Sequence, residues 1–531
     1  MIFEKQLPPG WSWARVDEVG EVRLGRQRAP EHHTGTHMRP YLRVANVFED
    51  RIDTSDVFEM NFTPEEYERY KLLPGDILLN EGQSRELVGR PAIYRDEMPG
   101  ACFQNTLIRF RARQSVIPEF ALLVFRTYLH SGRFQSISKW TTSIAHLGAD
   151  RFASLEFPVP PLAEQRRIVS KLEALLSRSR LAKEALDAIP ALLERFRQAV
   201  LAAAFRGALT ERWRSQTRKT KPTSDLLEQI RAERRRRWED VVQERLRLKA
   251  KTPKAESWKT EYDEPTLRID PDAPKAEWFG DLDSLGWNAA PLELLADPVR
   301  GIPYGIVITG DPHPTGVPTV RCGDIKNFSI ELDPLKRVNP EIASQYSRTR
   351  LEGGEVLVAI RGTVGGVAVA SLAMAGMNIS REVAMVPSLP GVQPRFLMYL
   401  LASPVAVRIL AGHTKGVAQS GVNLDDLRSF PVPLPSTAEQ NEIVKFIEQA
   451  FARISTVHER WKQASEQLDL LNESMLSRAF CGELVPQDPN DEPASVLLER
   501  IRAEREAAAS SPKQRRSTKA TGRKSATGNP T

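Results

Sequence analysis

Three short segments carry residue types whose spacing could support chemistry. Residues 32–37 contain three histidines, two of them four apart, a spacing that can bind a metal ion, but the sequence between them indicates a loop and no further ligand follows. Residues 361–366 are rich in glycine but lack the Gly-Lys-Ser/Thr ending of a phosphate-binding loop. Residues 136–139 have a Ser-x-x-Lys spacing without the companion motifs of an acyl-enzyme. We interpret all three segments as polar loops.

The sequence offers no motif for chemistry on DNA either. Adenine methylation would need an Asn/Asp-Pro-Pro-aromatic loop, but the Asn-Pro pairs at 339–340 and 529–530 are followed by Glu341 and Thr531. The acidic residues of 270–275 suggest nuclease carboxylates, yet they lie in a linker without a supporting strand. We therefore assign no catalytic or metal-binding residue and expect the chain to be no enzyme and to bind no cofactor itself.

Loops about 275 residues apart carry matching clusters of cationic and hydrogen-bonding side chains. Such side chains read base edges and hold phosphates. Each is more often a solvated loop residue when taken singly, but their recurrence favours a shared role in binding DNA. The candidates are Arg43, Asn46, Gln83, Ser84, Arg85, Arg90, Lys139, Thr141, Thr142, Ser143 and His146, and then Arg321, Lys326, Arg361, Thr363, His413, Thr414, Lys415, Gln419 and Ser420.

The whole chain repeats itself at this interval, and such a repeat decides the architecture. Each half runs from a variable block into a shared helical block. Five motifs occur twice: Gly-Trp at 10–11 and 286–287, Phe-Pro-Val-Pro at 157–160 and 430–433, Ala-Glu-Gln at 163–165 and 438–440, Ala-Phe-x-Gly at 204–207 and 479–482, and Leu-Leu-Glu-x-Ile-Arg-Ala-Glu-Arg at 226–234 and 497–505.

The two helical blocks carry apolar residues at alternating steps of four and three. A heptad seam of this length is buried against another seam, so we predict two helices of about 40 residues, roughly 60 Å each, that pair as an antiparallel coiled coil. Pro190 predicts a kink. The alternative is that each helix packs separately on its own domain. The seam positions are Ile168, Leu172, Leu175, Ser179, Ala182, Leu186, Ile189, Leu193, Phe196 and Val200, and then Ile443, Ile447, Ala450, Ile454, Val457, Trp461, Ala464, Leu468, Leu471 and Met475.

The variable blocks predict mixed α/β domains, because short β-rich runs lie between turn residues and a helix follows in each block. The runs include 76–79, 92–94, 106–110 and 355–360, and the helices are predicted at 119–129 and 395–401. The fold class is therefore α+β, with two such domains joined by the helix pair in a pseudo-twofold internal repeat. The predicted regions are a first domain at 1–158, a helical region at 159–213, a charged helical insert at 214–282, a second domain at 283–431, a helical region at 432–487, a short helix at 488–506 and a disordered basic tail at 507–531.

Composition excludes several classes of protein. The 531 residues are too many for one small binding module, and the longest uncharged apolar stretch, 367–377, is far short of a membrane span. Without a signal-like start, we expect a cytoplasmic protein. The net charge is +6, and the last 25 residues contribute six basic side chains and no acidic ones, so bulk charge does not indicate nucleic-acid binding. Cys102, Cys322 and Cys481 lie too far apart to suggest a metal or disulfide framework and are predicted to be buried thiols.

Over about residues 5–506 the chain resembles the specificity subunit of bacterial Type I restriction-modification enzymes. The most specific marks are the paired segments Phe157–Ile168 and Phe430–Ile443, the heptad helices after them, and the Ala-Phe-x-Gly turns. The resemblance implies that each variable block is a target-recognition domain for one half of a split, asymmetric DNA sequence. It also implies that the helices fix the gap between the half-sites. The long charged insert and the basic tail depart from the family pattern.

The same resemblance implies partners that do the chemistry. Two methyltransferase subunits would dock on the helical regions, and motor-nuclease subunits would join the assembly. Methylation of adenine with S-adenosylmethionine, and restriction with ATP and Mg²⁺, would belong to those partners. Three alternatives stay open: a coiled-coil adaptor that binds protein partners without DNA specificity, a chain that itself cuts or methylates DNA, and a reader that serves a methylase-nuclease fusion.

Overall fold

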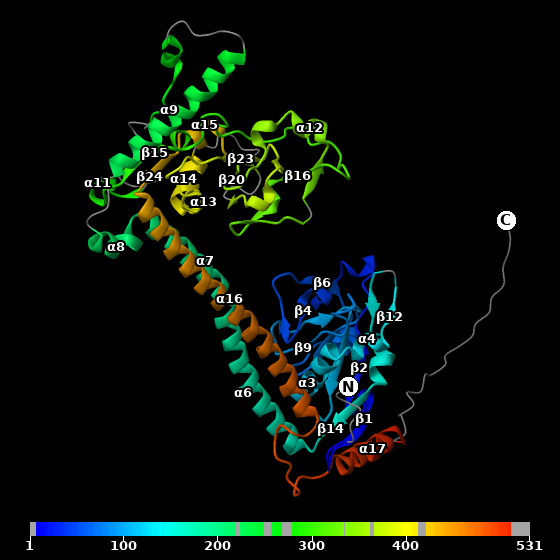
Figure 1. The fold of residues 1–531 in the computed structure, drawn as a ribbon. Helices are drawn as coiled ribbons and strands as arrows, with labels where there is room; N and C mark the ends of the chain where they lie inside the picture. Colours follow the sequence, from blue (N-terminus) through cyan, green and yellow to red (C-terminus); the bar gives the residue numbers. More distant parts are fainter. Residues whose placement is uncertain are drawn as a thin grey trace, which may run out of the picture. The chain divides into compact units, whose positions relative to one another are not determined.

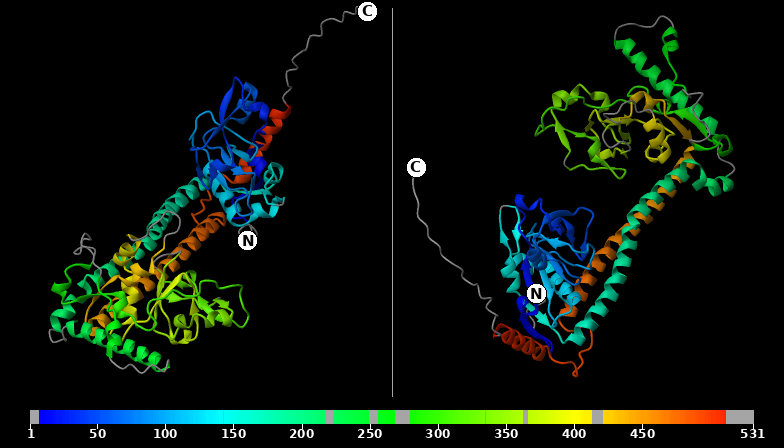
Figure 2. Two further views of the ribbon diagram at one scale, coloured as in Figure 1. Left: turned by 90° about the horizontal axis from the view of Figure 1, so that it is seen from above. Right: turned by 180° about the vertical axis from the view of Figure 1, so that it is seen from behind.

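The computed structural model describes residues 7–141, 143–217, 223–248, 256–267, 279–333, 335–361, 366–412 and 421–510. The chain forms two compact units, drawn in Figures 1 and 2. Unit 1 comprises Met1–Leu186 and Gln463–Thr531, and unit 2 comprises Asp187–Lys462. Each unit therefore contains one of the predicted domains together with parts of both helical segments.

The domain of unit 1 is built from small sheets around the helix α3 (Pro118–His130). An antiparallel sheet has the order β2 (Gly20–Leu24), β11 (Leu107–Ala112), β7 (Ile77–Asn80), β9 (Pro91–Ile93). A second sheet has β3 (Met38–Leu42) between the parallel β10 (Cys102–Phe103) and the antiparallel β6 (Phe58–Asn61). The remaining pairings are β1 (Ser12–Arg15) with β14 (Glu156–Val159), β4 (Val47–Phe48) with β5 (Arg51–Ile52), and β8 (Gly82–Gln83), β13 (Ala145–His146) and β12 (Lys139–Trp140) in one sheet.

Unit 2 repeats this topology, which confirms the internal repeat. Here β16 (Val317–Val320) lies between the parallel β22 (Asn378–Ile379) and the antiparallel β19 (Lys336–Val338). The other counterparts are the sheet β21 (Val367–Val369), β20 (Val356–Ala359), β23 (Val383–Val386), the pair β15 (Asn288–Pro291) and β24 (Pro431–Leu434), the hairpin β17 (Ile325–Lys326) and β18 (Ser329–Ile330), and the helix α13 (Pro394–Leu401).

Short runs of apolar residues produce the buried strands and helices of both domains. β7 and β20 are buried along their whole length, as expected for strands in the middle of a sheet. α3 and α13 each begin with a proline, which is favoured at the first helical position because its missing N–H would have no partner there. The strands predicted near 76–79, 92–94, 106–110 and 355–360, and the helices at 119–129 and 395–401, are confirmed to within two residues.

Two helical segments run antiparallel within each unit. The first is divided into α6 (Leu162–Asp187) and α7 (Ile189–Phe205) by Ala188, so the predicted kink near Pro190 is a break between two helices. The second is the single helix α16 (Thr437–Phe480). In unit 1, Lys183 Nζ lies 3.5 Å from Asp469 Oδ1. In unit 2, the guanidinium of Arg197 on α7 lies over the ring of Phe451 on α16.

The heptad seam is most deeply buried where the helices meet the domains. Ile168 and Ile443 are fully buried, whereas Phe196 and Leu471 farther along the seam are each 53% exposed. The seam residues near the domains pack on the domain as well as on the neighbouring helix, as the core clusters of both units show. The helices therefore pack on each other and also on their own domains, so the structure combines features of the two alternatives considered from the sequence.

The repeated Ala-Phe-x-Gly turn ends each helical segment against a domain. Phe480 packs edge-on against Phe120 of α3, with ring centroids 5.8 Å apart, and Phe205 packs in the same way against Phe396 of α13 at 5.5 Å. Both turn glycines, Gly207 and Gly482, have φ near +70° (+75° and +70°), the left-handed conformation that favours glycine after a helix. The motif thus stops the helix and docks its last aromatic ring.

A repeated polar contact fixes the start of each helical segment on its domain. The indole N–H of Trp11 donates to Glu164 Oε2, and that of Trp287 donates to Glu439 Oε2, both at 3.0 Å. The two carboxylates differ in their other contacts. Glu439 also accepts from Arg214, whereas Glu164 Oε1 is buried without a hydrogen-bond partner, and burial raises the pKa of Glu164.

The charged insert contains a helix that packs on the domain of unit 2. This helix, α9 (Thr223–Leu248), buries Ile230, and its Arg234 donates to the carbonyl oxygens of Glu293 and Ala296. Its counterpart α17 (Ala494–Ser510), which carries the second copy of the motif, buries Leu498 in unit 1. The first half of the insert is therefore part of the repeat.

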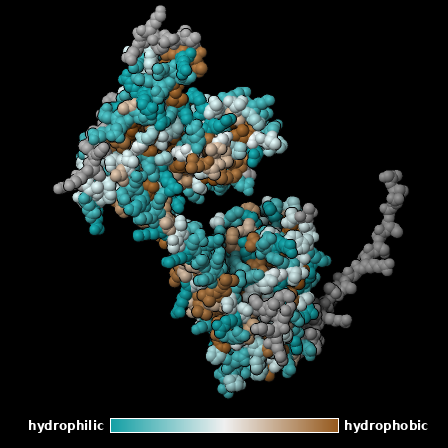
Figure 3. All heavy atoms as spheres, viewed as in Figure 1, coloured by the Kyte–Doolittle hydropathy of each residue, from teal (hydrophilic) through white to brown (hydrophobic). Residues whose placement is uncertain are grey.

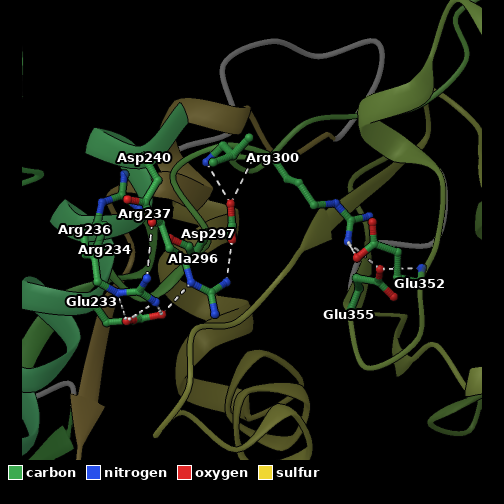
Figure 4. A network of polar contacts seen from close by, with 11 residues as sticks. Glu233, Arg234, Arg236, Arg237, Asp240, Ala296, Asp297, Arg300, Glu352 and Glu355 are labelled. Atoms are coloured by element: carbon green, nitrogen blue, oxygen red, sulfur yellow. Dashed lines mark hydrogen bonds and ion pairs between the residues drawn. The ribbon is translucent and has the colours of Figure 1, made fainter. Parts of the chain in front are cut away.

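A network of ion pairs connects α9 with the sheet of unit 2, as Figure 4 shows. Arg237 donates to Asp297 Oδ2 at 2.7 Å, and Asp297 Oδ1 accepts from the backbone N–H groups of Val299 and Arg300. Arg300 then donates to Glu355 Oε1 at 2.7 Å. Burial alone would raise the pKa of Asp297, but these hydrogen bonds outweigh it and hold the pKa below its ordinary value of 3.8.

Asp297→Ala is expected to lower the free energy of unfolding of unit 2 by about 1–3 kcal/mol, because Arg237 Nη1 and two backbone N–H groups lose their acceptor, while Arg237 keeps only its pair with Glu233. Since the folded pKa is lowered, this stabilisation is present above the ordinary pKa and is lost as pH falls through the folded value. Denaturant unfolding at pH 7 and at pH 3 tests both statements. Asp240→Asn, in an exposed pair on α9, is the control and should change stability little; equal effects of the two variants would contradict the role of Asp297.

Three sequence predictions remain to be compared with the fold. Cys102 is a buried thiol as predicted, but the prediction is wrong for Cys322 and Cys481, which are only partly buried. No helix among the described residues is long and apolar enough to cross a membrane. The tail predicted to be disordered from 507 is helical up to Ser510, where α17 ends, and its residues from 511 onward fall outside the described residues.

Candidate nucleic-acid interface

The first candidate cluster of unit 1 is a tight turn between β3 and β4. Asn46 is buried: its Oδ1 accepts from Arg43 N, and its Nδ2 donates to the carbonyl oxygens of Asp53 and Asp56. Arg43 is partly exposed, lies over the ring of Phe58 and donates to Asp56 at 2.5 Å. Asn46 therefore holds the turn and has no free group for a base, whereas the guanidinium of Arg43 is at the surface.

The second cluster surrounds the small sheet of β8, β13 and β12. His146 Nδ1 lies 3.0 Å from Glu81 Oε2, and Arg85 is exposed with its guanidinium over the ring of Trp140. Trp140 is 50% exposed, and Lys139 beside it is exposed as well. The sheet thus presents an aromatic ring covered by one cation, Arg85, and a second exposed cation, Lys139, at the adjacent position of the same strand.

Thr106 holds these two clusters next to each other. Its hydroxyl oxygen accepts from Val44 N at 3.2 Å, and its carbonyl oxygen accepts from Glu81 N at 2.9 Å. The turn with Arg43 and the loop with Arg85 are therefore neighbours, although about 40 residues separate them in sequence. Together they form one polar surface of unit 1.

The remaining candidates of unit 1 differ in accessibility. Arg90 is partly buried, donates to Val47 O at 2.6 Å and lies over the Phe48 ring, so it supports the β4–β5 hairpin. Gln83 accepts from the backbone N–H of Ser84, and both are partly buried. Thr141 and Ser143 are exposed at the tip of the β12–β13 connection. Thr142 lies outside the described residues.

Unit 2 contains the corresponding turn and the edge of the corresponding loop. Arg321 pairs with Asp324, whose carboxylate accepts from Arg321 N at 2.8 Å, the arrangement that Asn46 makes in unit 1. Lys326 is exposed and pairs with Glu331. The exposed Arg361 forms an antiparallel backbone β-bridge with Gly421, at the place where β8 pairs with β13 in unit 1. Thr363, His413, Thr414, Lys415, Gln419 and Ser420 fall outside the described residues.

Sequence reasoning missed cationic residues on the sheet beside each turn. In unit 2 an open pocket of about 660 Å³ is lined by Arg321 and also by His313, Lys336 and Arg337. In unit 1, Arg39 lies on β3 of the matching sheet, and its guanidinium lies over the ring of Tyr67. No periodic pattern could have identified these residues, because β3 carries only Arg39, and Lys336 and Arg337 of β19 are adjacent and point to opposite faces of the strand.

Three comparisons with known proteins agree on the family. The family model for the Type I restriction modification DNA specificity domain matches residues 8–191 and 313–465, more than half of the chain. The chain belongs to this family of specificity subunits. It is 31% identical over 395 residues to the Type I restriction enzyme EcoBI specificity subunit of Escherichia coli, covering 72% of each chain. It is 24% identical over 526 residues to the EcoKI specificity subunit of Escherichia coli strain K12, covering 94% of this chain and 97% of that one.

Solved structures show the same fold. The crystal structure of the HsdS subunit from Thermoanaerobacter tengcongensis superposes with a TM-score of 0.52 at 20% identity, over 91% of this chain and 99% of that one. A chain from a study of complex assembly and conformational transition of the type I R-M system gives 0.54 at 18% identity, over 90% and 100%. The specificity subunit described here therefore has two DNA recognition domains, one in each unit.

The histidines of the specificity subunit that suggested a metal site have other contacts. His32 Nδ1 lies 3.3 Å from Arg26 Nη2, and His33 Nε2 accepts from Arg28 at 3.1 Å. Within the described ranges, no group of three His, Cys, Asp or Glu side chains is arranged to hold a metal ion. His33 lies near the turn of Arg43 through its partner Arg28, because the guanidinium groups of Arg28 and Arg43 both lie over the ring of Phe58.

Proposed function

We propose that each unit reads one half of a bipartite, asymmetric DNA sequence. The observation that carries this proposal is that the same turn, loop and sheets occur once in each unit with different side chains at the surface. Phe48 is matched by Lys326, for example, and Gly82 by Arg361. One architecture with two sets of polar groups fits two different half-sequences.

The accessible candidates are proposed as the DNA contacts. Arg85, Lys139 and His146 of unit 1, and Arg321, Lys326 and Arg361 of unit 2, are at least partly exposed and belong to types that bind bases or phosphates. Arg43, Gln83, Ser84, Thr141 and Ser143 join them, as do Thr142, Thr363, His413, Thr414, Lys415, Gln419 and Ser420, which the structure does not describe. We assign Asn46 and Arg90 a positioning role.

We further propose that the helix pair sets the gap between the half-sites and that its outer surface binds methyltransferase subunits. Leu181 and Leu470 in unit 1 are 61% and 64% exposed, and Leu192 and Phe196 in unit 2 are exposed as well. Figure 3 shows apolar surface over the helix pair of unit 1. Exposed apolar side chains of this size are typical of surfaces that a partner covers.

The chemistry is proposed to belong to the partners. Methyltransferase subunits would supply S-adenosylmethionine and the catalytic residues, and motor-nuclease subunits would use ATP and Mg²⁺, while this chain provides specificity and remains non-catalytic. A cytoplasmic location, where the cell's DNA is found, follows from the same proposal.

Mapping of modified adenine across the genome tests the function. A host that expresses this chain with its methyltransferase partner is expected to show a split, asymmetric motif, and the same host without this chain is expected to lose it. No difference, with the complex shown to be assembled, would contradict the proposal and favour an adaptor that binds only proteins.

Lys139→Ala is expected to weaken binding to all DNA sequences alike, because an exposed lysine at the edge of a small sheet contacts phosphates as a point charge. The slope of log K against log salt should fall by about 1. Titration of the assembled complex with target and random duplexes between 50 and 200 mM salt measures both effects. Lys171→Ala, exposed on α6, is the control. A loss confined to the target duplex would assign Lys139 to base recognition instead.

A further inference from the structure

A two-stranded hairpin follows the DNA-reading turn directly in both units. In unit 2 the turn ends at Asp324 and β17 begins at Ile325; in unit 1 the turn ends at Asn46 and β4 begins at Val47. The base of each hairpin is hydrogen-bonded to the turn, through Glu331 N to Asp324 O and Asp53 N to Asn46 O, both at 2.8 Å. A displacement of the hairpin tip is therefore transmitted to the turn.

The hairpin tip of unit 2 has an unusual backbone. Asn327 and Phe328 are the two residues between β17 and β18, and both have positive φ, 50° and 64°. A two-residue turn of this kind favours glycine at the second position. Phenylalanine there is strained, and such strain persists only where contacts of the side chain hold it.

Those contacts are with the helices that carry the domain. The ring of Phe328 lies edge-on to Tyr399 of α13, with centroids 5.3 Å apart, and stacks on Phe451 of α16 at 5.6 Å. Arg197 of α7 lies over the Phe451 ring. The three helices and the tip line an open pocket of about 670 Å³, so the tip is held through its ring and not by close packing on all sides.

The hairpin tip of unit 1 makes an ionic contact at the corresponding place. Glu49 Oε1 accepts from Arg126 Nε and lies 2.9 Å from His130 Nε2, both on α3. Burial alone would raise the pKa of Glu49, but these neighbours lower it to about 2. The other face of α3 packs into the same core as Leu172 of α6. Glu49 is the first tip residue of its hairpin and Phe328 the second, but both contact the equivalent helix of their unit, α3 or α13. Chemically different contacts between hairpin tip and helix in both units indicate a shared requirement.

We propose that Phe328 and Glu49 are positioning residues that fix each DNA-reading turn relative to the helix pair of its own unit, and thereby set how strictly the specificity subunit selects the gap between half-sites. Neither residue needs to touch DNA. One added base pair moves a half-site by about 3.4 Å and about a tenth of a turn, a change that a reading turn free to shift on its domain would tolerate. This inference rests on the proposed function.

The test uses the full chain assembled with its methyltransferase subunits, and duplexes that carry both half-sequences found by methylation mapping. Methylation rates are measured with the natural gap and with gaps one base pair shorter and longer. In Phe328→Gly the backbone of the tip is relieved of strain while the ring is lost. The ratio of rates for natural and altered gaps is expected to fall by about tenfold, while a changed half-sequence still abolishes methylation.

Matched variants separate positioning from folding. Asn327→Gly changes the same turn but keeps the ring, and Phe328→Tyr keeps the aromatic contact, so both should retain the gap preference of the wild type. In unit 1, Glu49→Gln removes the charge and should relax the gap preference, whereas Glu59→Gln, exposed on the neighbouring strand β6, should not. If the Phe328→Gly protein does not assemble with its methyltransferase subunits, the comparison of Glu49→Gln with Glu59→Gln tests the proposal by itself.

The possible results point to different conclusions. A wild-type complex that shows no sequence preference would refute the proposed function itself. A wild-type complex that selects its gap, together with Phe328→Gly and Glu49→Gln variants that select it equally well, would overturn only this inference. Relaxed selection of the gap with both half-sequences still required would establish it.

Discussion

Replacing residues 288–434 by the same block of another specificity subunit is expected to change one half of the recognised sequence completely and to leave the other half unchanged. The exchanged segment begins and ends with the paired strands β15 and β24. It leaves Trp287 and Glu439 in place, so the contact that fixes the domain on α16 is kept. Specificity should follow the block because all the described candidate contacts of unit 2 lie within it.

Methylation mapping of the exchanged protein measures the outcome. The incoming block needs an aromatic residue at the place of Phe396, since Phe205 of α7 packs against it. An exchanged protein with that residue replaced by alanine is the control and should lose stability without acquiring a different target. A change in both half-sequences would contradict the modular arrangement of the two units.

Deleting one heptad from each helix is expected to shorten the gap by about three base pairs while both half-sequences are kept. Seven residues correspond to about 10 Å of helix, and base pairs are spaced about 3.4 Å apart. The segments 180–186 and 466–472 are suitable because Lys183 and Asp469, at their centres, face each other in unit 1. Removal of a whole heptad from both helices preserves the seam.

The control removes residues 180–186 alone. This deletion keeps the heptad phase but makes the first helical segment about 10 Å shorter, while α16 keeps its length. The contacts of Glu164 and Phe205 at the two ends of that segment can then not both form, so assembly with the methyltransferase subunits should be lost. An unchanged gap in the double deletion, with the complex assembled, would show that something other than the helices sets the distance.

Much of this architecture could be predicted from the sequence, because repeats and heptads are regular patterns. The contact between Trp11 and Glu164 could not, since the two residues are 153 positions apart and no spacing rule links them. Only the structure shows that the repeated Gly-Trp and Ala-Glu-Gln motifs supply the donor and the acceptor of this contact. The heptad spacing, by contrast, predicts two long helices from the sequence alone, but it does not predict that seam residues far from the domains, such as Phe196 and Leu471, are exposed.

The candidate site was predicted less completely than the fold. Asn46 was chosen for its chemistry, but its side chain accepts a hydrogen bond from the backbone three residues earlier, and Asp324 does the same. That spacing of three is a known signature of a capped turn and could have identified both residues as structural. Accessibility itself depends on contacts such as Thr106 with Val44, which no local pattern reveals.

The way in which the chain divides between the two units has a consequence for its synthesis on the ribosome. Unit 2 is one continuous segment, whereas unit 1 needs Phe480 and Leu498 to complete the core around Phe120. A ribosome adding about 5–20 residues per second makes the nearly 300 residues between 186 and 480 in roughly 15 to 60 seconds. The first domain to be synthesised is therefore the last to be completed, and until then its uncovered aromatic core is a target for chaperones.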